Sequence, residues 1–415
     1  MLTRRDWLAA TLPAAALAQP TAPPNIVVFM TDQESALLPG PASLPHRQSL
    51  LQNGIQFRHA FCNTPQCSPA RAALLTGLEP HRAGVLTNID TGSLGRTLDP
   101  SIPTLAHVLK KAGYETAYFG KWHLSSTNQG IRDYGFDSYQ NGSDSAMAAS
   151  AAAWMRGRKA PFLAWISLLD PHHIYDIPKR LTSVKPRPGV RPPLSGLENL
   201  DGKPAEQREF VDKDQGRQTR NFSREDWLRY RSLYLELVEK TDNLLGTVRD
   251  GIANPASTCF AYTSDHGDAL GEHGLSYKGP FMYEELLRIP FLLSGAGLKR
   301  RLRHDLVRQT DLAPTLAALA GVRWPSRTDG RNLLQDTKGP DAVLLEYYSK
   351  QKWVNPIRTI RTRRWKLNWY DRGAKELYDL ERDPAERINL AGRSSHTAIQ
   401  ATLEARIRSW RAPLT

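Results

Sequence analysis

Four short apolar segments, each followed closely by polar residues, constrain the fold of this 415-residue chain more than any other feature. They cover Asn25–Met30, Glu115–Phe119, Phe162–Leu169 and Thr258–Ser264. Helical patterns separate them: Pro103–Lys111 has apolar residues on one face, and a longer helix begins after Ser223. Buried strands that alternate with helices predict an α/β domain with a mostly parallel sheet.

The residues that follow these segments bring charge to one edge of the predicted sheet. Each segment leads into a charged or titratable side chain: Asp32, Lys121, His172 and Asp265. Ligands of open α/β sheets bind beyond the carboxyl ends of the strands. The sequence therefore predicts a functional site at this edge.

The chain changes character near residue 340. Alternating, aromatic-rich segments typical of antiparallel strands cover Leu344–Tyr348, Ile357–Ile360, Trp365–Tyr370 and Glu376–Leu380. An amphipathic segment, Ile399–Trp410, predicts a closing helix. Residues 180–220 are rich in Pro, Lys, Arg and Asp and lack periodicity, so we expect an exposed excursion there, either a flexible linker or a loop that shapes access to the site.

The amino terminus has the features of an export signal. Arg4 and Arg5 precede the apolar run Trp7–Leu17, and Ala16-Leu17-Ala18 forms a small-x-small cleavage site. The paired arginines predict a twin-arginine signal over residues 1–18. From this signal we expect an exported, periplasmic bacterial protein. Because the apolar run is too short to span a bilayer, we expect no stable membrane anchor.

Charge and cysteine content narrow the classes of partner. The chain has 55 Lys and Arg against 42 Asp and Glu, a net charge of +13 at pH 7. No nucleic-acid-binding motif accompanies the charge, so we predict no nucleic-acid partner; anionic substrates and a simply solvated basic surface both stay open. Cys62, Cys67 and Cys259 are too few for a disulfide framework. We expect Cys62 and Cys259 to be buried and free, and a pairing between them stays open.

The segment Cys67–Arg71, with the sequence CSPAR, combines a cysteine with a helix start. Ser68 suits the N-cap and Pro69 the first helical position, and the helix should stop at Gly77. Cys67 then lies where free backbone N–H groups favour an anion, and Arg71, one turn along, adds a positive charge on the same face. The alternative for so short a match is a buried cysteine before a capped helix.

Groups suited to anionic ester chemistry thus converge on one predicted surface. Candidate ligands for a divalent cation are Asp32, Gln33, Asp265 and His266. Candidates to neutralise a sulfuryl or phosphoryl group are Arg71, Lys121 and Lys278. Candidates for proton transfer are His123, His172, His173 and His273. Each alone has a structural alternative, and their joint placement favours a site.

With these motifs the chain resembles the type I, formylglycine-dependent sulfatases of the alkaline phosphatase superfamily. Cys67–Arg71 fits the cysteine-type C-x-P-x-R modification motif, and Leu75–Gly77 follows where the family has its second short element. Further family elements recur in the same order: Gly120–His123, Pro171-His172, Ser264–Asp268, Gly271–Gly274, Lys278, Glu376–Leu380, Asp383-Pro384 and Asn389-Leu390. The resemblance covers nearly the whole mature chain.

This resemblance implies an alkaline-phosphatase-like fold. We expect a large, mostly parallel sheet flanked by helices, and a smaller C-terminal α+β domain that carries an antiparallel sheet. The implied boundaries are residues 19–338 for the catalytic sulfatase domain and 339–415 for the small domain.

The resemblance also implies that a formylglycine-generating enzyme oxidises Cys67 to formylglycine. The hydrated aldehyde offers two hydroxyls on one carbon: one, activated by the metal, attacks sulfur to form a covalent sulfate ester as the alcohol leaves, and the other, once deprotonated, expels sulfate.

The resemblance assigns these roles residue by residue. The implied metal ligands are Asp32, Asp265, His266 and the modified Cys67, with Gln33 as a further candidate. Arg71, Lys121 and His123 would hold the aldehyde, with His123 as the base of the elimination. His172 and Lys278 would bind sulfate and protonate the leaving oxygen. His173 is a weaker candidate, and His273 is as much a structural candidate as a functional one.

Two positions depart from the commonest family pattern. Asp32-Gln33 stands where many sulfatases have paired aspartates, and Asp265-His266 where others have Asp-Asn. Both variants recur in the superfamily, the Asp-Gln form in choline sulfatases and phosphonate monoester hydrolases. One carboxylate fewer and one imidazole more make the metal shell less negative. We expect Ca²⁺, with Mn²⁺ or Mg²⁺ as alternatives.

Three functions are compatible with these motifs. The leading hypothesis is an exported sulfatase that acts on a sulfated small molecule or glycan. The nearest alternative is a phosphonate monoester hydrolase or phosphodiesterase with the same nucleophile, because sulfate and phosphate esters share their geometry. The third is an inactive sulfatase-like protein that binds anionic glycans, which the full set of charged motif positions disfavours.

Overall fold

The structure is a computed structural model that describes residues 23–91, 94–125, 128–159, 161–325, 327–335, 338–350 and 353–410. The signal predicted over residues 1–18 lies outside these ranges and stays a prediction. Within them, every helix is too short or too polar to cross a membrane.

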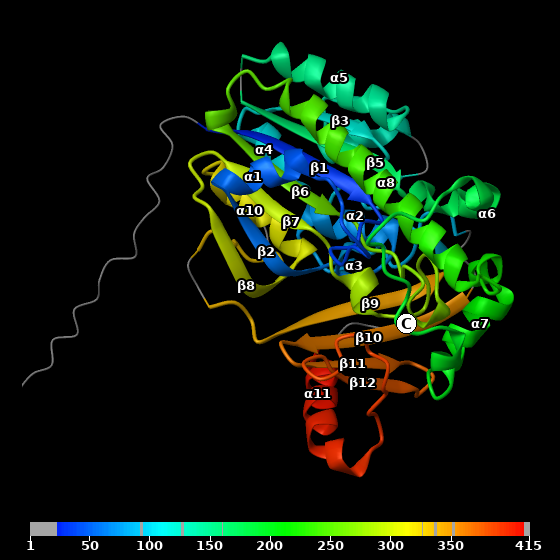
Figure 1. The fold of residues 1–415 in the computed structure, drawn as a ribbon. Helices are drawn as coiled ribbons and strands as arrows, with labels where there is room; N and C mark the ends of the chain where they lie inside the picture. Colours follow the sequence, from blue (N-terminus) through cyan, green and yellow to red (C-terminus); the bar gives the residue numbers. More distant parts are fainter. Residues whose placement is uncertain are drawn as a thin grey trace, which may run out of the picture.

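An eight-stranded sheet forms the centre of the molecule (Figure 1). Its strands are β1 (Asn25–Asp32), β2 (Gly54–Phe61), β3 (Glu115–Gly120), β4 (Ser138–Gln140), β5 (Phe162–Pro171), β6 (Thr258–Ser264), β7 (Phe291–Gly295) and β8 (Arg301–Arg308). Their order is β4-β3-β5-β1-β6-β7-β2-β8. Only β7 runs antiparallel to its neighbours among these strands, so the predicted mostly parallel sheet is confirmed.

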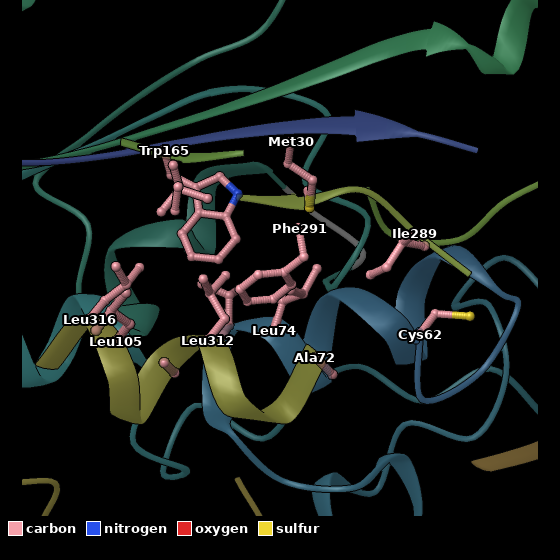
Figure 2. Close-up of a cluster of buried hydrophobic side chains, with 14 of the residues drawn as sticks. Met30, Cys62, Ala72, Leu74, Leu105, Trp165, Ile289, Phe291, Leu312 and Leu316 are labelled. Carbon is pink, nitrogen blue, oxygen red and sulfur yellow. The ribbon is translucent and has the colours of Figure 1, made fainter. Parts of the chain in front are cut away.

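Helices cover both faces of this sheet because alternate residues of the buried strands point to opposite sides. On one face, Ile26, Val28 and Met30 of β1 pack with α2 (Cys67–Thr76), α4 (Leu105–Lys111) and α10 (Leu312–Leu319). Figure 2 shows part of this core, in which Leu74, Leu105 and Leu312 lie beneath Trp165 and Met30.

The opposite face carries the other half of the core. Val27 and Phe29 of β1 pack with α1 (Pro45–Leu50), α5 (Asp144–Arg156) and α8 (Arg224–Arg249). As predicted, Ser223 caps α8, where its hydroxyl accepts a hydrogen bond from the backbone N–H of Asp226. The remaining α-helices are α3 (Pro80–Ala83), α6 (Ile177–Arg180), α7 (Ala205–Lys213), α9 (Glu284–Leu287) and α11 (Thr397–Ser409).

A second sheet follows the large one in the sequence. It contains β9 (Ala342–Lys350), β10 (Trp353–Thr362), β11 (Trp365–Tyr370) and β12 (Lys375–Asp379), in the order β12-β11-β10-β9, and every pairing is antiparallel. Helix α11 packs on it through Leu403 and Ile407. The predicted small α+β region with an antiparallel sheet is therefore confirmed.

Residues 180–220 match the expected exposed excursion only in part, since most of residues 180–204 are exposed or half-buried. They contain α7, whose Phe210 and Val211 are buried in one core cluster with Phe281 and Tyr283. The sequence does not predict this helix because it is short and has few buried apolar side chains among many charged ones. Residues 205–213 are therefore packed against the fold through α7.

Candidate active site

The ends of two neighbouring strands bring two carboxylates together. β1 and β6 are parallel neighbours whose register pairs Thr31 with Ser264, so Asp32 and Asp265 leave the sheet side by side. The chain then turns at Gln33, which adopts a left-handed φ of 73° and donates its backbone N–H to Asp265 Oδ1 at 3.0 Å. The polar residues predicted at this edge thus lie where expected.

Helix α2 points its first residues at the same edge. It begins at Cys67 with Gln66 as N-cap, so the predicted Ser68 cap is wrong. Asn88 supplies the missing acceptor, because its Oδ1 receives the Ser68 backbone N–H at 3.0 Å. Gly77, with a φ of 68°, ends the helix as predicted.

Arg71, one turn after Cys67 in α2, binds both carboxylates. Its Nε and a terminal nitrogen donate to Asp265 Oδ2 and Asp32 Oδ2 at 3.0 and 2.9 Å. The other terminal nitrogen reaches the Lys121 carbonyl and Ser167 Oγ, both at 2.7 Å. The Arg71 side chain is 1% exposed, so these bonds fix a buried guanidinium group next to the two carboxylates.

Four metal-type donors surround one point. Single donor atoms of Asp32, Cys67, Asp265 and His266 all lie within 4.8 Å of one another, and all four residues are buried. His266 Nδ1 lies 2.9 Å from the Gly267 carbonyl, which favours a proton there and leaves Nε2 as a free ligand atom facing Cys67 Sγ at 3.4 Å.

The contacts of Lys278 show that these donors attract positive charge. Its Nζ lies 2.9 Å from Cys67 Sγ, 3.0 Å from His266 Nε2 and 3.1 Å from Gln33 Oε1. Gln33 is oriented for this contact because its Nε2 donates to Asp268 Oδ2 at 2.7 Å. Carboxylate and amide oxygens with one imidazole suit a divalent cation, so this donor set is compatible with a metal site.

The loop after β3 brings two more predicted residues. Lys121 Nζ lies 2.5 Å from Asp32 Oδ2 and 3.5 Å from Cys67 Sγ. Trp122 anchors the loop by packing its ring at right angles to Tyr118, with centroids 5.1 Å apart. His123 then takes a left-handed φ of 60°, and its Nε2 lies 3.7 Å from Asp90 Oδ1.

His172 follows β5 and faces the same space. Its ring stacks on Tyr175 with centroids 4.7 Å apart, and Tyr175 stacks on Tyr277 at 4.0 Å. The ladder of rings holds the imidazole at the cavity wall. Burial, together with Lys278 and Lys121, lowers the pKa of His172 to about 3, although Asp32 opposes the shift. The imidazole is therefore neutral at pH 7.

These groups open into a cavity of about 480 Å³. Predicted residues in its lining are Cys67, Lys121, His123, His172 and Lys278. Further lining residues are Gln66, Asn88, Asp90, Thr91, Tyr175, Gln215, Gly279, Tyr347 and Lys350. Strand ends and one helix start thus supply the reactive groups, while loops and β9 supply the wall.

Comparison with known proteins identifies the family. The sulfatase family model matches residues 24–322, and a model described as N-sulphoglucosamine sulphohydrolase, C-terminal, matches residues 271–413.

The chain belongs to the sulfatase family.

It is 29% identical to a choline-sulfatase of Rhizobium meliloti, with 93% of this chain and 86% of the relative covered. It is 26% identical to a Delta 4,5-hexuronate-2-O-sulfatase of Bacteroides thetaiotaomicron, with coverage of 93% and 88%.

Solved structures share the fold. A 2-O GAG sulfatase superposes with a TM-score of 0.81 at 23% identity and covers 94% of this chain and 92% of its own. The phosphonate monoester hydrolase of Agrobacterium radiobacter also gives 0.81, at 20% identity, with coverage of 94% and 95%. The alkaline-phosphatase-like fold is confirmed. This sulfatase is a sulfuric ester hydrolase, so the hypothesis of an inactive binding protein is set aside.

The electrostatics of this sulfatase site favour bound anionic oxygen. Burial and Asp32 oppose ionisation of the Cys67 thiol, but Lys121 and Lys278 more than offset them and hold its pKa well below the usual range. Burial likewise opposes ionisation of Asp32, yet Lys121 and its cationic neighbours hold that pKa well below the usual range. Burial and the charge of Asp32 raise the pKa of Asp265.

Two predicted histidines lie outside the cavity lining. His173 is partly exposed, and its Nδ1 lies 2.5 Å from Asp170 Oδ1. His273 is buried, lies 2.5 Å from Asn199 Oδ1 and stacks on Tyr283 with centroids 4.0 Å apart. These contacts hold the His273 ring in the interior, outside the cavity lining. Both cysteines outside the site, Cys62 and Cys259, are buried and free, so they do not pair.

Several lining residues carry no recognisable sequence signal. Asn88 and Asp90 lie in a loop without periodicity, and Tyr347 and Lys350 lie in a strand that alternates like any other. Gln215 lies in the segment expected to be an excursion. Tyr175 alone had a usable signal, because it follows the predicted His172 by three residues in a short helical turn.

Proposed function

We propose that this sulfatase hydrolyses a sulfate ester of a carbohydrate through a formylglycine that a formylglycine-generating enzyme makes from Cys67. One observation carries the proposal: Cys67 opens a helix in a buried site where Lys121 and Lys278 lie within 3.5 Å of its Sγ. Two ammonium groups at this position stabilise negative charge, which an oxygen of the formylglycine would gain as it attacks sulfur.

The proposed metal ligands are Asp32, Gln33, the modified Cys67, Asp265 and His266, and we propose Ca²⁺ as the ion, with Mn²⁺ or Mg²⁺ as alternatives. When bound, the cation would supply Lewis-acid stabilisation of developing negative charge. Arg71 holds the carboxylates of Asp32 and Asp265 in one orientation.

The remaining residues then take separate roles. Lys121 and His123 hold the hydrated aldehyde, and His123 removes the proton that starts the release of sulfate. The pKa of His123 is raised because Asp90 and Cys67 outweigh its burial. His172, neutral with a pKa of about 3, donates a hydrogen bond to the sulfate ester, and Lys278 delivers the proton to the leaving oxygen.

A sugar is the proposed carrier of the sulfate. A structural neighbour with a TM-score of 0.73 at 22% identity is in complex with its substrate D-glucosamine-2-N,6-O-disulfate, and a curated relative is a hexuronate sulfatase. The cavity of about 480 Å³ has the size of an ordinary small-molecule site and has room for a sugar ring beside the reactive centre.

The second candidate is a phosphonate monoester hydrolase with the same nucleophile. It is favoured by Gln33 and His266 in the ligand set, which lower the negative charge around the metal, and by the Agrobacterium radiobacter neighbour. Turnover of an aryl sulfate and an aryl phosphonate monoester by one preparation separates the two. Faster sulfate turnover is expected, and clearly faster phosphonate turnover would overturn the first choice.

The mass of the tryptic peptide that ends at Arg71 tests the nucleophile. We expect the aldehyde in protein from the native host, and complete loss of turnover in Cys67→Ala with an unchanged circular dichroism spectrum. An unmodified thiol in active enzyme would refute the mechanism.

We further propose that the chain is exported to the periplasm with loss of residues 1–18, and that residues 19–338 and 339–415 are its two domains. Sequencing the amino terminus of the mature protein from a periplasmic extract tests the export. A mature chain that retains Arg4 and Arg5 would refute cleavage.

A further inference from the structure

A second hollow lies on the segment that links α7 to α8. It is lined by Asp214, Arg217, Gln218, Arg220 and Asn221. Gln215, within the same segment, lines the active-site cavity. The Cα atoms of Gln215 and Arg217 can be at most about 7.6 Å apart, because consecutive Cα atoms are about 3.8 Å apart. Residues only two positions apart in one segment therefore line the two hollows.

Side-chain contacts join the two hollows. The Tyr277 hydroxyl donates to Gln218 Oε1 at 3.2 Å. Tyr277 stacks on Tyr175, a residue of the active-site wall, with ring centroids 4.0 Å apart. Packed side chains thus connect the lining of the active-site cavity to the lining of the second hollow through the buried Tyr277.

The segment that carries this hollow is firmly packed. Phe210 of α7 packs its ring edge-on against Phe281, with centroids 5.1 Å apart. A Cβ at Gly216 would lie 2.9 Å from the Phe210 ring, so the turn is closed tightly on the helix. Lys350 of β9 also contacts this segment: its Nζ lies 3.0 Å from Asp214 Oδ2 and donates to Gln215 Oε1 at 2.6 Å.

The charge of the second hollow is positive. Asp214 is its only acid among the described lining residues, and Lys350 neutralises that carboxylate. Arg217 and Arg220 are exposed, and within the described ranges neither guanidinium forms a hydrogen bond or ion pair. Carboxylate and sulfate oxygens match the forked donors of two such uncompensated guanidinium groups.

We propose that this hollow is a subsite for a second anionic group of the substrate, bound by Arg217 and Arg220 while the reacting sulfate ester lies at Cys67. The inference rests on the proposed function and narrows its substrate class. The preferred substrate is a sugar with at least two anionic groups, one of which stays intact. A sulfate ester of a neutral or cationic alcohol would leave the second hollow unused.

Binding to a catalytically silent protein tests the subsite directly. In the full chain with Cys67→Ala, the dissociation constants of D-glucosamine-2-N,6-O-disulfate and of 4-nitrophenyl sulfate are measured by calorimetry at low salt. The same measurement follows with Arg217→Gln and Arg220→Gln added together. The matched control is Arg372→Gln with Arg382→Gln, which removes two exposed arginines of the small domain.

We expect the two substitutions in the hollow to weaken binding of the disulfate about tenfold, the loss expected for two partly exposed charge-assisted contacts, and to leave aryl sulfate binding within twofold. The control should change neither constant. Equal effects on both probes, or no loss for the disulfate, would overturn the subsite. Sulfate turnover by the enzyme with intact Cys67 is measured separately, so failure of the subsite and failure of the proposed function give different results.

Discussion

Replacing Lys366 by methionine tests how the small antiparallel sheet is held to the rest of the molecule. Lys366 lies on β11 with no exposed side-chain surface, and its Nζ pairs with Glu386 and lies 3.4 Å from Glu284 Oε1. Glu284 begins α9, and it also pairs with Arg361 of β10 at 3.1 Å. Two buried carboxylates thus share two buried cations, and the substitution removes one cation while keeping most of the apolar stem.

The expected loss follows from the uncompensated charge. Removing one partner of a buried ion pair costs about 3–5 kcal/mol of unfolding free energy. Burial already raises the pKa of Glu386 to about 7 against the opposing effect of Lys366, so the substitution should raise this pKa further. A raised carboxyl pKa destabilises the folded protein above that pKa, and the penalty is lost as the pH falls below it. The loss should be greatest near pH 8.5 and clearly smaller near pH 6.

Urea unfolding followed by tryptophan fluorescence measures this loss, because Trp365 and Trp369 lie on the same strand as Lys366. The midpoint shift at constant slope gives the free-energy change. The matched control is Lys375→Met: this ammonium pairs with Glu404 at 2.8 Å but is 26% exposed, and such pairs contribute about 1 kcal/mol or less. Equal losses in the two variants, or a Lys366→Met loss that does not shrink at low pH, would refute the reasoning.

Three further predictions concern the site and its wall. Arg71→Lys keeps the charge but loses the fork that reaches Asp32 and Asp265, so kcat/KM for an aryl sulfate should fall by about 10²-fold with an unchanged circular dichroism spectrum; normal turnover would contradict the role of the fork. Metal removal by EDTA should abolish turnover and lower Tm, and Ca²⁺ should restore both; full activity in protein shown to be metal-free would contradict a catalytic metal. Gly216→Ala should cost about 1–3 kcal/mol in urea unfolding, because the new Cβ meets the Phe210 ring, and a loss below about 0.5 kcal/mol would show that the turn relaxes.

The predicted strand ends succeed because each depends on local information. Short apolar runs identify β1 and β6, and the parallel-sheet rule then places Asp32 and Asp265 at the same edge, whereas their position side by side follows from the strand order of the structure. The same reasoning locates Lys121 and His172. Local patterning and one topological rule are therefore enough to assemble most of the reactive centre.

The start of α2 shows where local preference fails. Ser68 is the better capping residue by type, yet the helix begins at Cys67, because Asn88 accepts the Ser68 backbone N–H from a loop 20 residues away. The sequence analysis missed helix α7 for a related reason. Its two buried apolar residues pack against residues that are distant in the sequence. Contacts with residues that are distant in the sequence produce no signal in the local sequence.

Strand β9 shows why a boundary near residue 338 separates sheets and does not separate functions. Its Ser349 carbonyl accepts the side chain of Gln66, the residue before Cys67, and Lys350 donates to the Lys278 carbonyl at 3.4 Å. Tyr347 and Lys350 also line the cavity itself. The small sheet therefore both shapes the substrate space and holds the backbone on either side of the reactive centre. Because one strand does both, we expect changes at Ser349 or Lys350 to affect the position of the reactive groups as well as the shape of the substrate space.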